Sequence, residues 1–515
     1  MSGQYKEWEE YCLEYVIIQA GGKGTRMETL TANKPKALVP VNNLPMIFHV
    51  FKKFPGRKFI IIGDYKYDVL RKYLAAFAEV DYTLICSRGK EGTCAGLKAA
   101  ISLIPQNEAF LLIWCDLVLA DDYTLPDSQD NYIGISKVFI CRWKYENNEF
   151  KEEPSSEFGV AGLFLFKDKS YLSDVPEEGE FVRWLGIKGL NFVPQPLYKS
   201  QEYGLKSEWE KLPVIEYRPF NRLEIKSDIV YKIPLDEQGR ALAKYEVSWY
   251  KRMSKLGFQN LPSIYGYDPL SMEFIKGKKI YEYTDTTREK KREILKEIVS
   301  LLKSIHEIET IPADAGSYYE AYIGKTFNRL KKIRALVPFA ENEYITVNNR
   351  KCRNVFFREE ELQTAVMEYL PDKFRLIHGD CTFSNTLLKN DSIPILIDPR
   401  GYFGTTELFG DAAYDWAKLY YSLYSNYDKF NLKKYDLQIN ENSVNLYIES
   451  NNWEMLEDDF FNMIGGEISR RQMKLLLSII WLSLTTYAWE DYDSICGAFY
   501  NGVYYLEEAF NGKNR

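Results

Sequence analysis

The sequence predicts an α/β protein of two domains, a mostly parallel sheet in residues 1–212 and an α+β domain in residues 213–515. Two observations predict this class. In the first part of the chain, short apolar runs alternate with amphipathic helical stretches, which is the rhythm of βαβ units. After Pro213 the pattern changes to paired alternating strands followed by long helical stretches. A length of 515 residues is enough for two or three hydrophobic cores.

The composition argues against several functional classes. With 46% hydrophobic and 27% charged residues the chain is expected to fold, and its net charge of −7 without a basic block argues against a nucleic-acid partner. The apolar run at 475–484 is too short to span a bilayer, and the N-terminus lacks signal-peptide features, so we expect a cytoplasmic protein without membrane insertion. Eight scattered cysteines and three histidines predict neither a zinc site nor disulfides.

The first predicted strand, Tyr15–Ala20, runs directly into the glycine-rich segment Gly21–Arg26, and a helix is expected after it. A strand, a glycine turn and a helix form a phosphate-binding arrangement, because backbone N–H groups can approach a triphosphate while Lys23 and Arg26 supply charge. Glycine turns alone are weak signals, and this spacing matches neither a P-loop nor a dinucleotide motif. The segment 34–41, KPKALVPV, follows and places Lys36 on the same side as the turn.

The next elements continue the βαβ rhythm. Strands are predicted at 59–62, 82–86 and 109–115, with helices at 68–77 and 98–104. Gly92–Leu97 is a second small-residue turn before a helix. Asp116 follows the last of these strands directly, and ligands bind at the carboxyl ends of strands in such sheets.

Together these motifs resemble the nucleotidyltransferase family that makes nucleotide sugars and CDP-choline, over roughly the first 210 residues. The resemblance implies a Rossmann-like fold that uses Mg²⁺ and a nucleoside triphosphate. It implies that Ala20, Gly21, Gly22, Gly24, Thr25 and Arg26 cradle the triphosphate, that Lys36 balances phosphate charge, that Gly92 and Thr93 flank the base, and that Asp116 binds Mg²⁺. The family's second metal carboxylate lies in a D-x-G-T segment; here the match is Glu202-Tyr203-Gly204, so Glu202 is either that ligand or an ordinary solvated carboxylate.

The second domain is predicted to begin with antiparallel strands at 214–226 and 228–234 and a helix at 242–253. Further helices are predicted at 288–308, 319–336 and 359–369, and a Leu-, Ile- and Trp-rich helix at 472–489. Aromatic residues of that last helix could line an acceptor pocket, but a core stripe at helical spacing is the preferred interpretation.

The segment 376–388, LIHGDCTFSNTLL, and the segment 395–401, ILIDPRG, carry the chemistry of this domain. Asp380 and Asn385 are spaced as in the kinase pattern H-x-D-x-x-x-x-N, where the carboxylate takes a hydroxyl proton and the amide holds a metal ion. Asp398 ends a short strand in reach of the same Mg²⁺. Any one of them alone would be read as a turn or capping residue, but three at these spacings are hard to produce by chance. Cys381 lies in the same loop and is interpreted as a buried small side chain.

This loop resembles that of the aminoglycoside phosphotransferase and choline kinase superfamily. The resemblance implies a bilobal, protein-kinase-like domain, with an N-lobe at about 213–280 and a C-lobe at about 281–515. Lys232 would hold ATP and Glu246 would pair with it. The segment 271–277 would be the hinge that holds adenine, through Glu273 and Ile275. Asp411 and Asp415 would brace the loop or cap a helix.

The predicted function is a bifunctional enzyme that phosphorylates a small alcohol with ATP and transfers a cytidylyl group from CTP to the product, for capsule or cell-surface synthesis. Choline is one candidate alcohol. Arg400 argues against it, because two like charges about 6 Å apart cost roughly 3 kcal/mol at an effective dielectric near 20. Arg400 would instead bind hydroxyls or a carboxylate, so a neutral sugar or polyol is preferred. The alternatives are a CDP-choline-producing enzyme, and a nucleotide-sensing or scaffold protein with one degenerate half.

Overall fold

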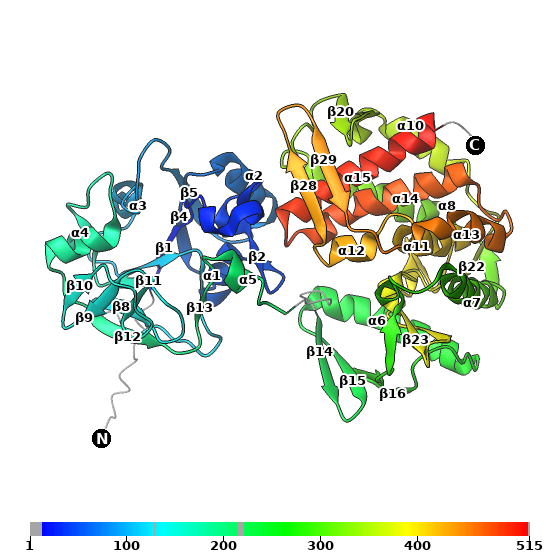
Figure 1. The fold of residues 1–515 in the computed structure, drawn as a ribbon, viewed down its shortest axis with the longest axis horizontal. Helices are drawn as coiled ribbons and strands as arrows, with labels where there is room; N and C mark the ends of the chain where they lie inside the picture. Colours follow the sequence, from blue (N-terminus) through cyan, green and yellow to red (C-terminus); the bar gives the residue numbers. More distant parts are fainter. Residues whose placement is uncertain (1–12, 128, 214–220, 513–515) are drawn as a thin grey trace, which may run out of the picture. The chain divides into compact units, whose positions relative to one another are not determined.

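The computed structural model describes residues 13–127, 129–213 and 221–512. The chain forms two compact units, an N-terminal unit that extends to Pro213 and a C-terminal unit that accounts for nearly all of the remainder. The predicted fold class is confirmed, since the first unit contains a largely parallel sheet and the second has the two-lobed α+β organisation expected of a kinase-like domain (Figure 1). None of the helices in the described part of the chain has the length and apolar character that crossing a bilayer requires.

The N-terminal unit is built on a nine-stranded sheet. In spatial order the strands are β10 (Glu149–Lys151), β9 (Lys144–Glu146), β11 (Gly159–Phe166), β6 (Phe110–Trp114), β1 (Tyr15–Gln19), β4 (Lys58–Gly63) and β5 (Tyr82–Cys86), while β8 (Tyr132–Ser136) pairs with β11 and with β12 (Val193–Leu197). β6, β1, β4 and β5 run parallel, and β11 runs antiparallel to β6. The inner parallel strands β1, β4 and β6 have buried apolar runs, as expected of a sheet covered on both faces, whereas the edge strand β5 is partly exposed.

Helices cover the parallel strands. They are α1 (Met46–Lys53), α2 (Tyr67–Phe77), α3 (Leu97–Ser102) and α4 (Phe181–Lys188). Ile17 and Leu112 are register partners on β1 and β6, and both pack in a core shared with α3 and α4. The carboxyl ends of β1 and β6 are thereby fixed next to each other, which sets the position of the segments that follow these strands.

The helix predicted directly after the glycine turn is not an α-helix. Thr25–Thr31 forms a 3₁₀ helix with a kink at Glu28, whose φ of 51° is left-handed. Gly24 before it has φ of 62°, so the chain turns twice within a few residues. The glycine segment at the carboxyl end of β1 therefore leads into a tight, irregular turn.

The C-terminal unit begins with a smaller lobe. Its antiparallel sheet has the order β14 (Asn221–Lys226), β15 (Ile229–Pro234), β17 (Leu270–Glu273) and β16 (Ile264–Tyr267), and α6 (Glu237–Lys255) packs against β15 (Figure 1). The part of the first predicted strand at 214–220 lies outside the described residues. A strand, β18 (Gly277–Lys279), follows and joins the hairpin β23 (Thr386–Lys389) and β24 (Ile393–Leu396).

The larger lobe is mainly helical. Its helices include α7 (Arg288–His306), α8 (Ala315–Tyr319), α9 (Lys325–Ile333), α10 (Glu359–Met367), α11 (Ala412–Leu423), α12 (Tyr427–Asn431), α13 (Glu457–Ile464), α14 (Arg470–Leu484) and α15 (Tyr492–Asn511). Short strands complete it: β19 (Thr310–Pro312), β22 (Lys373–Leu376) and β27 (Phe409–Gly410) form one sheet, and β20 (Tyr344–Val347), β21 (Arg350–Arg353), β28 (Tyr435–Ile439) and β29 (Val444–Ile448) form another.

Two helix predictions for this lobe can be compared with the structure. The stretch predicted as one helix at 319–336 is divided, because a π-helical turn at Glu320–Gly324 separates α8 from α9. α14 is a core helix, since Trp481 is fully buried and its indole N–H donates to the Ser425 hydroxyl at 3.1 Å. Its aromatic side chain thus packs inside the lobe, as the core interpretation predicts.

A pair of glycine substitutions tests how tightly the N-terminal sheet is packed. Gly162 in β11 and Gly189 after α4 both have positive φ, of 81° and 68°. A Cβ at Gly162 would overlap the Trp114 ring, whereas one at Gly189 would meet nothing within 4 Å. Gly189→Ala should therefore cost about 1 kcal/mol of unfolding free energy from backbone strain, and Gly162→Ala about 1–3 kcal/mol more.

Chemical denaturation of the full-length protein, followed by the intrinsic fluorescence of its tryptophans, measures the difference between the two variants. Because both glycines have left-handed backbone conformations, the strain common to the two substitutions cancels in the comparison. Equal stability of the two variants would show that the Trp114 ring does not restrict this position.

Candidate active sites

The candidate site of the N-terminal unit joins a lysine to two carboxylates. Asp116 follows β6, and its carboxylate forms an ion pair with Lys36. Glu202 lies in β13 (Gln201–Glu202), which pairs with β7 (Leu117–Val118) so that Glu202 is the register partner of Leu117. This pairing brings Glu202 beside Asp116, although the two are far apart in the sequence. Arg26 closes the group, with its guanidinium 3.9 Å from the Glu202 carboxylate.

The charges of this group depend on one another. Burial raises the pKa of Glu202 to about 7, and the Asp116 carboxylate contributes in the same direction. Burial opposes the charge of Lys36, but Asp116 more than compensates, so the pKa of Lys36 lies above its ordinary value. Two neighbouring carboxylates repel each other when both are ionised, and a bound cation would relieve this repulsion.

The glycine turn lies against the same lysine. The Ala20 N–H donates to the Ile62 carbonyl at 2.8 Å, which fixes the start of the turn on β4. A Cβ at Gly24 would lie 3.2 Å from the Lys36 Cβ, whereas one at Gly22 would meet nothing within 4 Å. Gly21 and Thr25 complete the segment, and the Arg26 side chain is 64% exposed. The turn therefore presents bare backbone and an exposed cation on the side where Lys36 and Asp116 lie.

Gln19, at the end of β1, lies against the second glycine turn and was not singled out from the sequence. Gly92 has φ of 87°, and any Cβ there would overlap the Gly179 carbonyl. The Gln19 amide N–H donates to the Thr93 carbonyl, and the Thr93 hydroxyl accepts from the Phe181 N–H at 2.7 Å. The Gln19 amide oxygen is buried and lacks a hydrogen-bond partner in the described part of the chain. A buried acceptor without a partner next to the predicted base-flanking turn is suited to a ligand donor.

The candidate site of the C-terminal unit is organised by Lys232. Its ammonium on β15 lies 2.8 Å from the Glu246 carboxylate on α6 and 3.0 Å from the Asp398 carboxylate after β24. Burial disfavours the charge of Lys232, but Asp398 and Glu246 together raise its pKa above the ordinary value. The predicted pair of Lys232 and Glu246 is therefore present, and Asp398 shares the same lysine.

The loop between β22 and β23 holds Asp380 and Asn385 in contact. Asp398 follows β24, and the N–H of the preceding Ile397 donates to the Asn385 carbonyl at 3.0 Å. The Asn385 amide donates at 2.9 Å both to the Asp380 carboxylate and to its backbone carbonyl. Asp398 has φ of 56°, a left-handed conformation that costs a non-glycine residue about 1–2 kcal/mol, and its N–H donates to the Tyr250 hydroxyl at 3.2 Å. Backbone strain of this kind gathers at functional sites.

Lys418 on α11 is a member of this site that the sequence analysis did not single out. Its ammonium lies 2.8 Å from the Asp380 carboxylate. Burial would raise the pKa of Asp380, but Lys418 outweighs it and holds that pKa below its ordinary value. Asp380 is therefore an ionised acceptor, able to receive a hydrogen bond from an incoming hydroxyl.

Two buried aspartates hold the loop in place. The Asp415 carboxylate accepts from the His378 N–H at 2.9 Å, from the Gly379 N–H at 2.7 Å and from the His306 ring at 2.9 Å. The Asp411 carboxylate caps α11 by accepting from the Ala413 N–H at 3.0 Å. Their contacts are with backbone and neighbouring side chains, in keeping with the predicted structural role. The Cys381 thiol is buried and donates to the Asp415 carbonyl at 3.1 Å.

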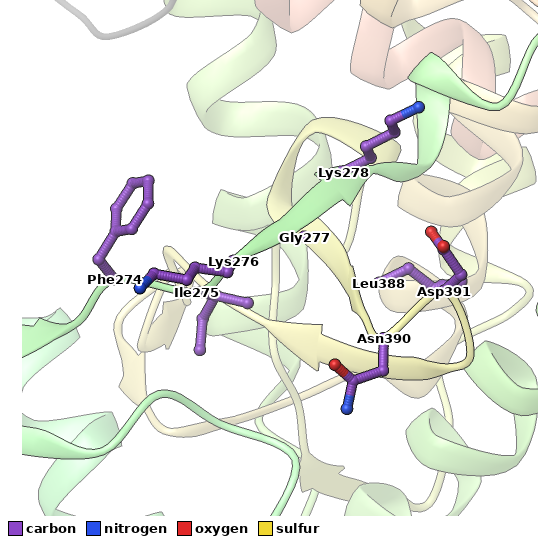
Figure 2. Close-up of a pocket in the computed structure, with 8 residues that line it drawn as sticks. All are labelled: Phe274, Ile275, Lys276, Gly277, Lys278, Leu388, Asn390 and Asp391. Atoms are coloured by element: carbon purple, nitrogen blue, oxygen red, sulfur yellow. The ribbon is translucent and has the colours of Figure 1, made fainter. Parts of the chain in front are cut away.

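The predicted hinge lies between β17 and β18. The Glu273 carboxylate accepts from the Lys389 ammonium at 2.7 Å and from the Ser263 hydroxyl at 3.1 Å, and the Glu273 N–H donates to the Ser263 carbonyl at 2.8 Å, so this residue is used within the lobe. A pocket beside the predicted hinge is lined by Phe274, Ile275, Lys276, Gly277, Lys278, Leu388, Asn390 and Asp391 (Figure 2). Neither Lys232 nor Asp398 lines it, so this pocket is separate from the group of charges described above.

Each group supplies two of the ligands that Mg²⁺ prefers, Asp116 with Glu202 in one unit and Asn385 with Asp398 in the other. Within the described residues, no cluster of three or more His, Cys, Asp or Glu side chains could hold a metal ion. Two protein ligands nevertheless fit Mg²⁺, which commonly binds one or two side chains and completes its shell with water and substrate phosphates.

Arg400 does not contact the carboxylates directly. Its guanidinium donates to the hydroxyls of Tyr414 at 2.6 Å and Tyr402 at 3.2 Å. It also stacks on the Tyr402 ring, with 4.4 Å from the guanidinium carbon to the ring centroid. Burial disfavours its charge, but the two tyrosine hydroxyls and the Asp380 carboxylate together raise the pKa of Arg400 above its ordinary value.

Comparison with known families divides the chain in the same way. Residues 16–147 match the model of the MobA-like NTP transferase domain. Residues 222–436 match the model of the phosphotransferase enzyme family. The predicted resemblance, a nucleotidyltransferase domain followed by a kinase-like phosphotransferase domain, is thereby confirmed.

Curated relatives match short stretches of the chain. The bifunctional protein GlmU of Methanococcus maripaludis is 23% identical over 170 residues, which cover 30% of this chain and 40% of the relative. The D-glycero-alpha-D-manno-heptose 1-phosphate guanylyltransferase of Campylobacter jejuni is 30% identical over 100 residues, covering 19% of this chain and 45% of the relative. The chain thus spans less than half the length of each of these two relatives.

Two solved structures illustrate the structural matches. The inositol-1-phosphate CTP transferase from T. maritima has a TM-score of 0.33 and 13% identity, and covers 38% of this chain and 91% of its own. The CTP:phosphocholine cytidylyltransferase from Streptococcus pneumoniae has a TM-score of 0.30 and 19% identity, and covers 38% of this chain and 97% of its own.

The pH dependence of stability tests the environment of Asp411. Burial raises the pKa of Asp411 to about 6, above its value of about 4 in an unfolded chain. The folded state therefore holds this proton more tightly, and its contribution to stability is present below pH 4 and is lost as the pH rises to 6. Asp411→Asn keeps a capping oxygen but cannot titrate, so between these pH values its unfolding free energy should fall less than that of the wild type, by on the order of 2 kcal/mol.

Denaturant titrations at several pH values measure this difference. All other titrating groups are common to the two proteins, so they cancel when the curves are subtracted. Parallel curves for the two proteins between pH 4 and 6 would show that Asp411 titrates normally.

Proposed function

We propose that this chain, which joins a nucleotidyltransferase domain to a phosphotransferase domain, carries out two consecutive reactions. The C-terminal unit would phosphorylate a small alcohol with ATP. The N-terminal unit would then transfer a nucleotidyl group, with CTP favoured, to the phosphorylated product. The result would be a CDP-activated sugar or polyol for capsule or cell-surface polysaccharide.

One observation carries the proposal: each unit gathers a buried lysine and two metal-suited side chains from distant parts of the sequence. In the first unit Lys36 lies with Asp116 and Glu202, and in the second Lys232 lies with Asp398, close to Asn385. Such groups match the charge of a triphosphate and a divalent cation. Two intact groups also argue against a sensor or scaffold with one degenerate half.

In the N-terminal unit, the transfer needs charge balance and alignment. An oxygen of the incoming phosphate monoester attacks the α-phosphorus, and the bond to the β-phosphate breaks so that pyrophosphate leaves with the electron pair. Mg²⁺ bound at Asp116 and Glu202 would offset charge on the transferring group. Lys36 and Arg26 would hold the phosphates, and the bare glycine backbone would let them approach. A general base is unnecessary, because the attacking phosphate is already ionised.

In the C-terminal unit, the alcohol must lose a proton during transfer. Asp380 is ionised and partly exposed, so it would accept the hydroxyl proton as the oxygen attacks the γ-phosphorus. The bond from the γ-phosphorus to the bridging oxygen breaks, and ADP leaves. Lys232 would bind the ATP phosphates and Lys418 would orient Asp380. Asn385 and Asp398 would hold Mg²⁺, which would offset the negative charge of the phosphates.

The preference for CTP is supported by Gln19. Because its amide N–H donates to the Thr93 carbonyl, its oxygen faces the other way as an unpaired acceptor. The 4-amino group of cytosine is a donor at the position where uracil has a carbonyl oxygen. An acceptor in that place would attract cytosine and repel uracil.

Two variants should separate the activities. Asp380→Asn removes the general base and should lower phosphoryl transfer from ATP by about 10²–10⁴-fold. Transfer of the nucleotidyl group to a chemically supplied phosphate ester should remain. Asp116→Asn should have the opposite effect, with a loss of about 10²-fold or more in pyrophosphate release.

Both variants are assayed for ADP formation and for pyrophosphate release with hexoses, pentitols, choline, ethanolamine and their phosphate esters. Each variant serves as the control for the other. Loss of both activities in either properly folded variant would contradict two independent sites, and turnover of choline alone would favour the CDP-choline alternative.

The role of Gln19 can be tested by binding. Gln19→Met keeps the side-chain size but removes the acceptor, so the dissociation constant of CTP should rise about tenfold. The dissociation constant of UTP should fall, because the repulsion between the Gln19 oxygen and the uracil carbonyl is removed. Isothermal titration of both nucleotides into the wild type and the variant measures this. A CTP affinity unaffected by the substitution would show that Gln19 does not read the base.

A further inference from the structure

Four cationic side chains gather beside the phosphoryl-transfer loop, and we call them the basic cluster. They are Lys325 and Arg329 on α9, Arg400 after β24, and Lys418 on α11. Three of them surround one ring: Arg400 donates to the Tyr414 hydroxyl, and the ammonium groups of Lys325 and Lys418 each lie 6.0 Å from the centre of the same ring. These segments are far apart in the sequence, so the cluster arises from the folding of the larger lobe.

The basic cluster adjoins the predicted general base. The Lys418 ammonium is 2.8 Å from the Asp380 carboxylate, and Arg400 also contributes to the low pKa of Asp380. A hydroxyl that gives its proton to Asp380 must approach within about 3 Å of this carboxylate. The remainder of the acceptor molecule would then lie against the cluster.

The positive charge of the cluster exceeds the negative charge that faces it. Asp380 faces Lys418, and Glu320 is the acidic side chain that acts on Lys325. Arg329 donates to the Ser483 carbonyl at 2.5 Å. Arg400 binds neutral tyrosine hydroxyls, and its buried Nε has no hydrogen-bond partner within the described residues.

Lys325 shows most clearly that positive charge is in excess in the basic cluster. In the described part of the chain its ammonium forms no ion pair or hydrogen bond, and it lies 6.0 Å from the centre of the Tyr414 ring. Burial, followed by the charges of Arg400, Arg329 and Lys418, lowers the pKa of Lys325 well below its ordinary value. The pKa of Arg329 is lowered by burial and by Arg400. The charges of Lys325 and Arg329 are thus disfavoured where they lie, and a bound anion would remove that cost.

We infer that the acceptor of the kinase is a hydroxyl compound that also carries an anionic group, a carboxylate or a phosphate ester. This inference rests on the proposed function, because it assigns the substrate class of the same site. The anion would lie against Lys325, Arg329 and Arg400, and the hydroxyl would point to Asp380. Sugar acids and polyol phosphates have this form, whereas choline carries a cation that the cluster would repel.

The first test uses an anion alone. The full-length protein is saturated with Mg²⁺ and a non-hydrolysable ATP analogue, which fills the nucleotide site including the γ-phosphate position. Inorganic phosphate and malonate are then titrated by calorimetry. The wild type should bind one or both, and Arg329→Gln should raise the dissociation constant about 10–100-fold, the range for a charge-assisted hydrogen bond.

Arg334→Gln is the matched control. Arg334 follows α9, is exposed, and pairs with Glu341 at 2.7 Å away from the cluster. Its substitution changes the net charge by the same amount and should leave anion binding unchanged. Lys325→Met provides a second cluster variant, and thermal unfolding verifies that each variant is folded. Absence of anion binding in the wild type, or equal loss in Arg329→Gln and Arg334→Gln, would overturn the inference.

The second test compares acceptors that share one skeleton. Glycerol, glycerate and glycerol 3-phosphate, and ribitol with ribitol 5-phosphate, are assayed for ADP formation at saturating ATP. The anionic members should have kcat/KM values at least tenfold higher, and Arg329→Gln should raise their KM with little change in the KM for ATP. Glycerate and glycerol 3-phosphate distinguish a carboxylate from a phosphate as the preferred anion.

The outcomes separate this inference from the proposed function. If neutral and anionic alcohols are phosphorylated equally well, the kinase function stands and the anionic acceptor is wrong. If anions bind in the first test but the folded protein also fails to use ATP with every class of alcohol, the basic cluster remains an anion site and the proposed kinase function is the part that fails.

Discussion

Pairing of buried lysines with carboxylates is the constraint on which both candidate sites depend. Lys232 is held between Glu246 and Asp398, and these three residues come from β15, α6 and the segment after β24. An unpaired buried ammonium would be costly, so the ion pairs fix the relative position of three elements before any nucleotide binds. Lys36 and Asp116 form the equivalent pair in the other unit. In each unit the lysine and carboxylate that we assign to phosphate and metal also satisfy each other.

The fold and the central residues of both groups could be predicted because their signals are local. The strands around Ile17 and Leu112 are continuous apolar runs, and the spacing of Asp380 and Asn385 lies within one loop. Glu202 could be named only as a departure from a motif; its position beside Asp116 follows from the pairing of β13 with β7, a contact that no spacing encodes. The helix expected after the glycine turn is instead a kinked 3₁₀ turn, because Gly24 and Glu28 both have positive φ.

The residues that could not be predicted act through long-range packing. Gln19 is the last residue of an otherwise apolar strand, so its sequence context indicates no function. Only the hydrogen bond to the Thr93 carbonyl shows which way its amide points. Lys325, Arg329 and Lys418 occupy helical positions where cations are usually solvated, so nothing in their spacing indicates a common site. With Arg400 alone in view, a neutral sugar or polyol was the natural expectation. The four cations beside the phosphoryl-transfer loop instead favour an acceptor that carries its own negative charge.

The Tyr414 ring has a consequence for how this enzyme could be redirected. A single aromatic side chain contacts Arg400 through its hydroxyl, and Lys325 and Lys418 through its face. One substitution here would remove a hydrogen-bond partner of Arg400 and a ring contact of both lysines, while Lys232 keeps its own partners Glu246 and Asp398. In directed evolution, Tyr414 is therefore the position at which one substitution would change the surroundings of several cations and so the range of compounds accepted, while the nucleotide-binding residues stay unchanged.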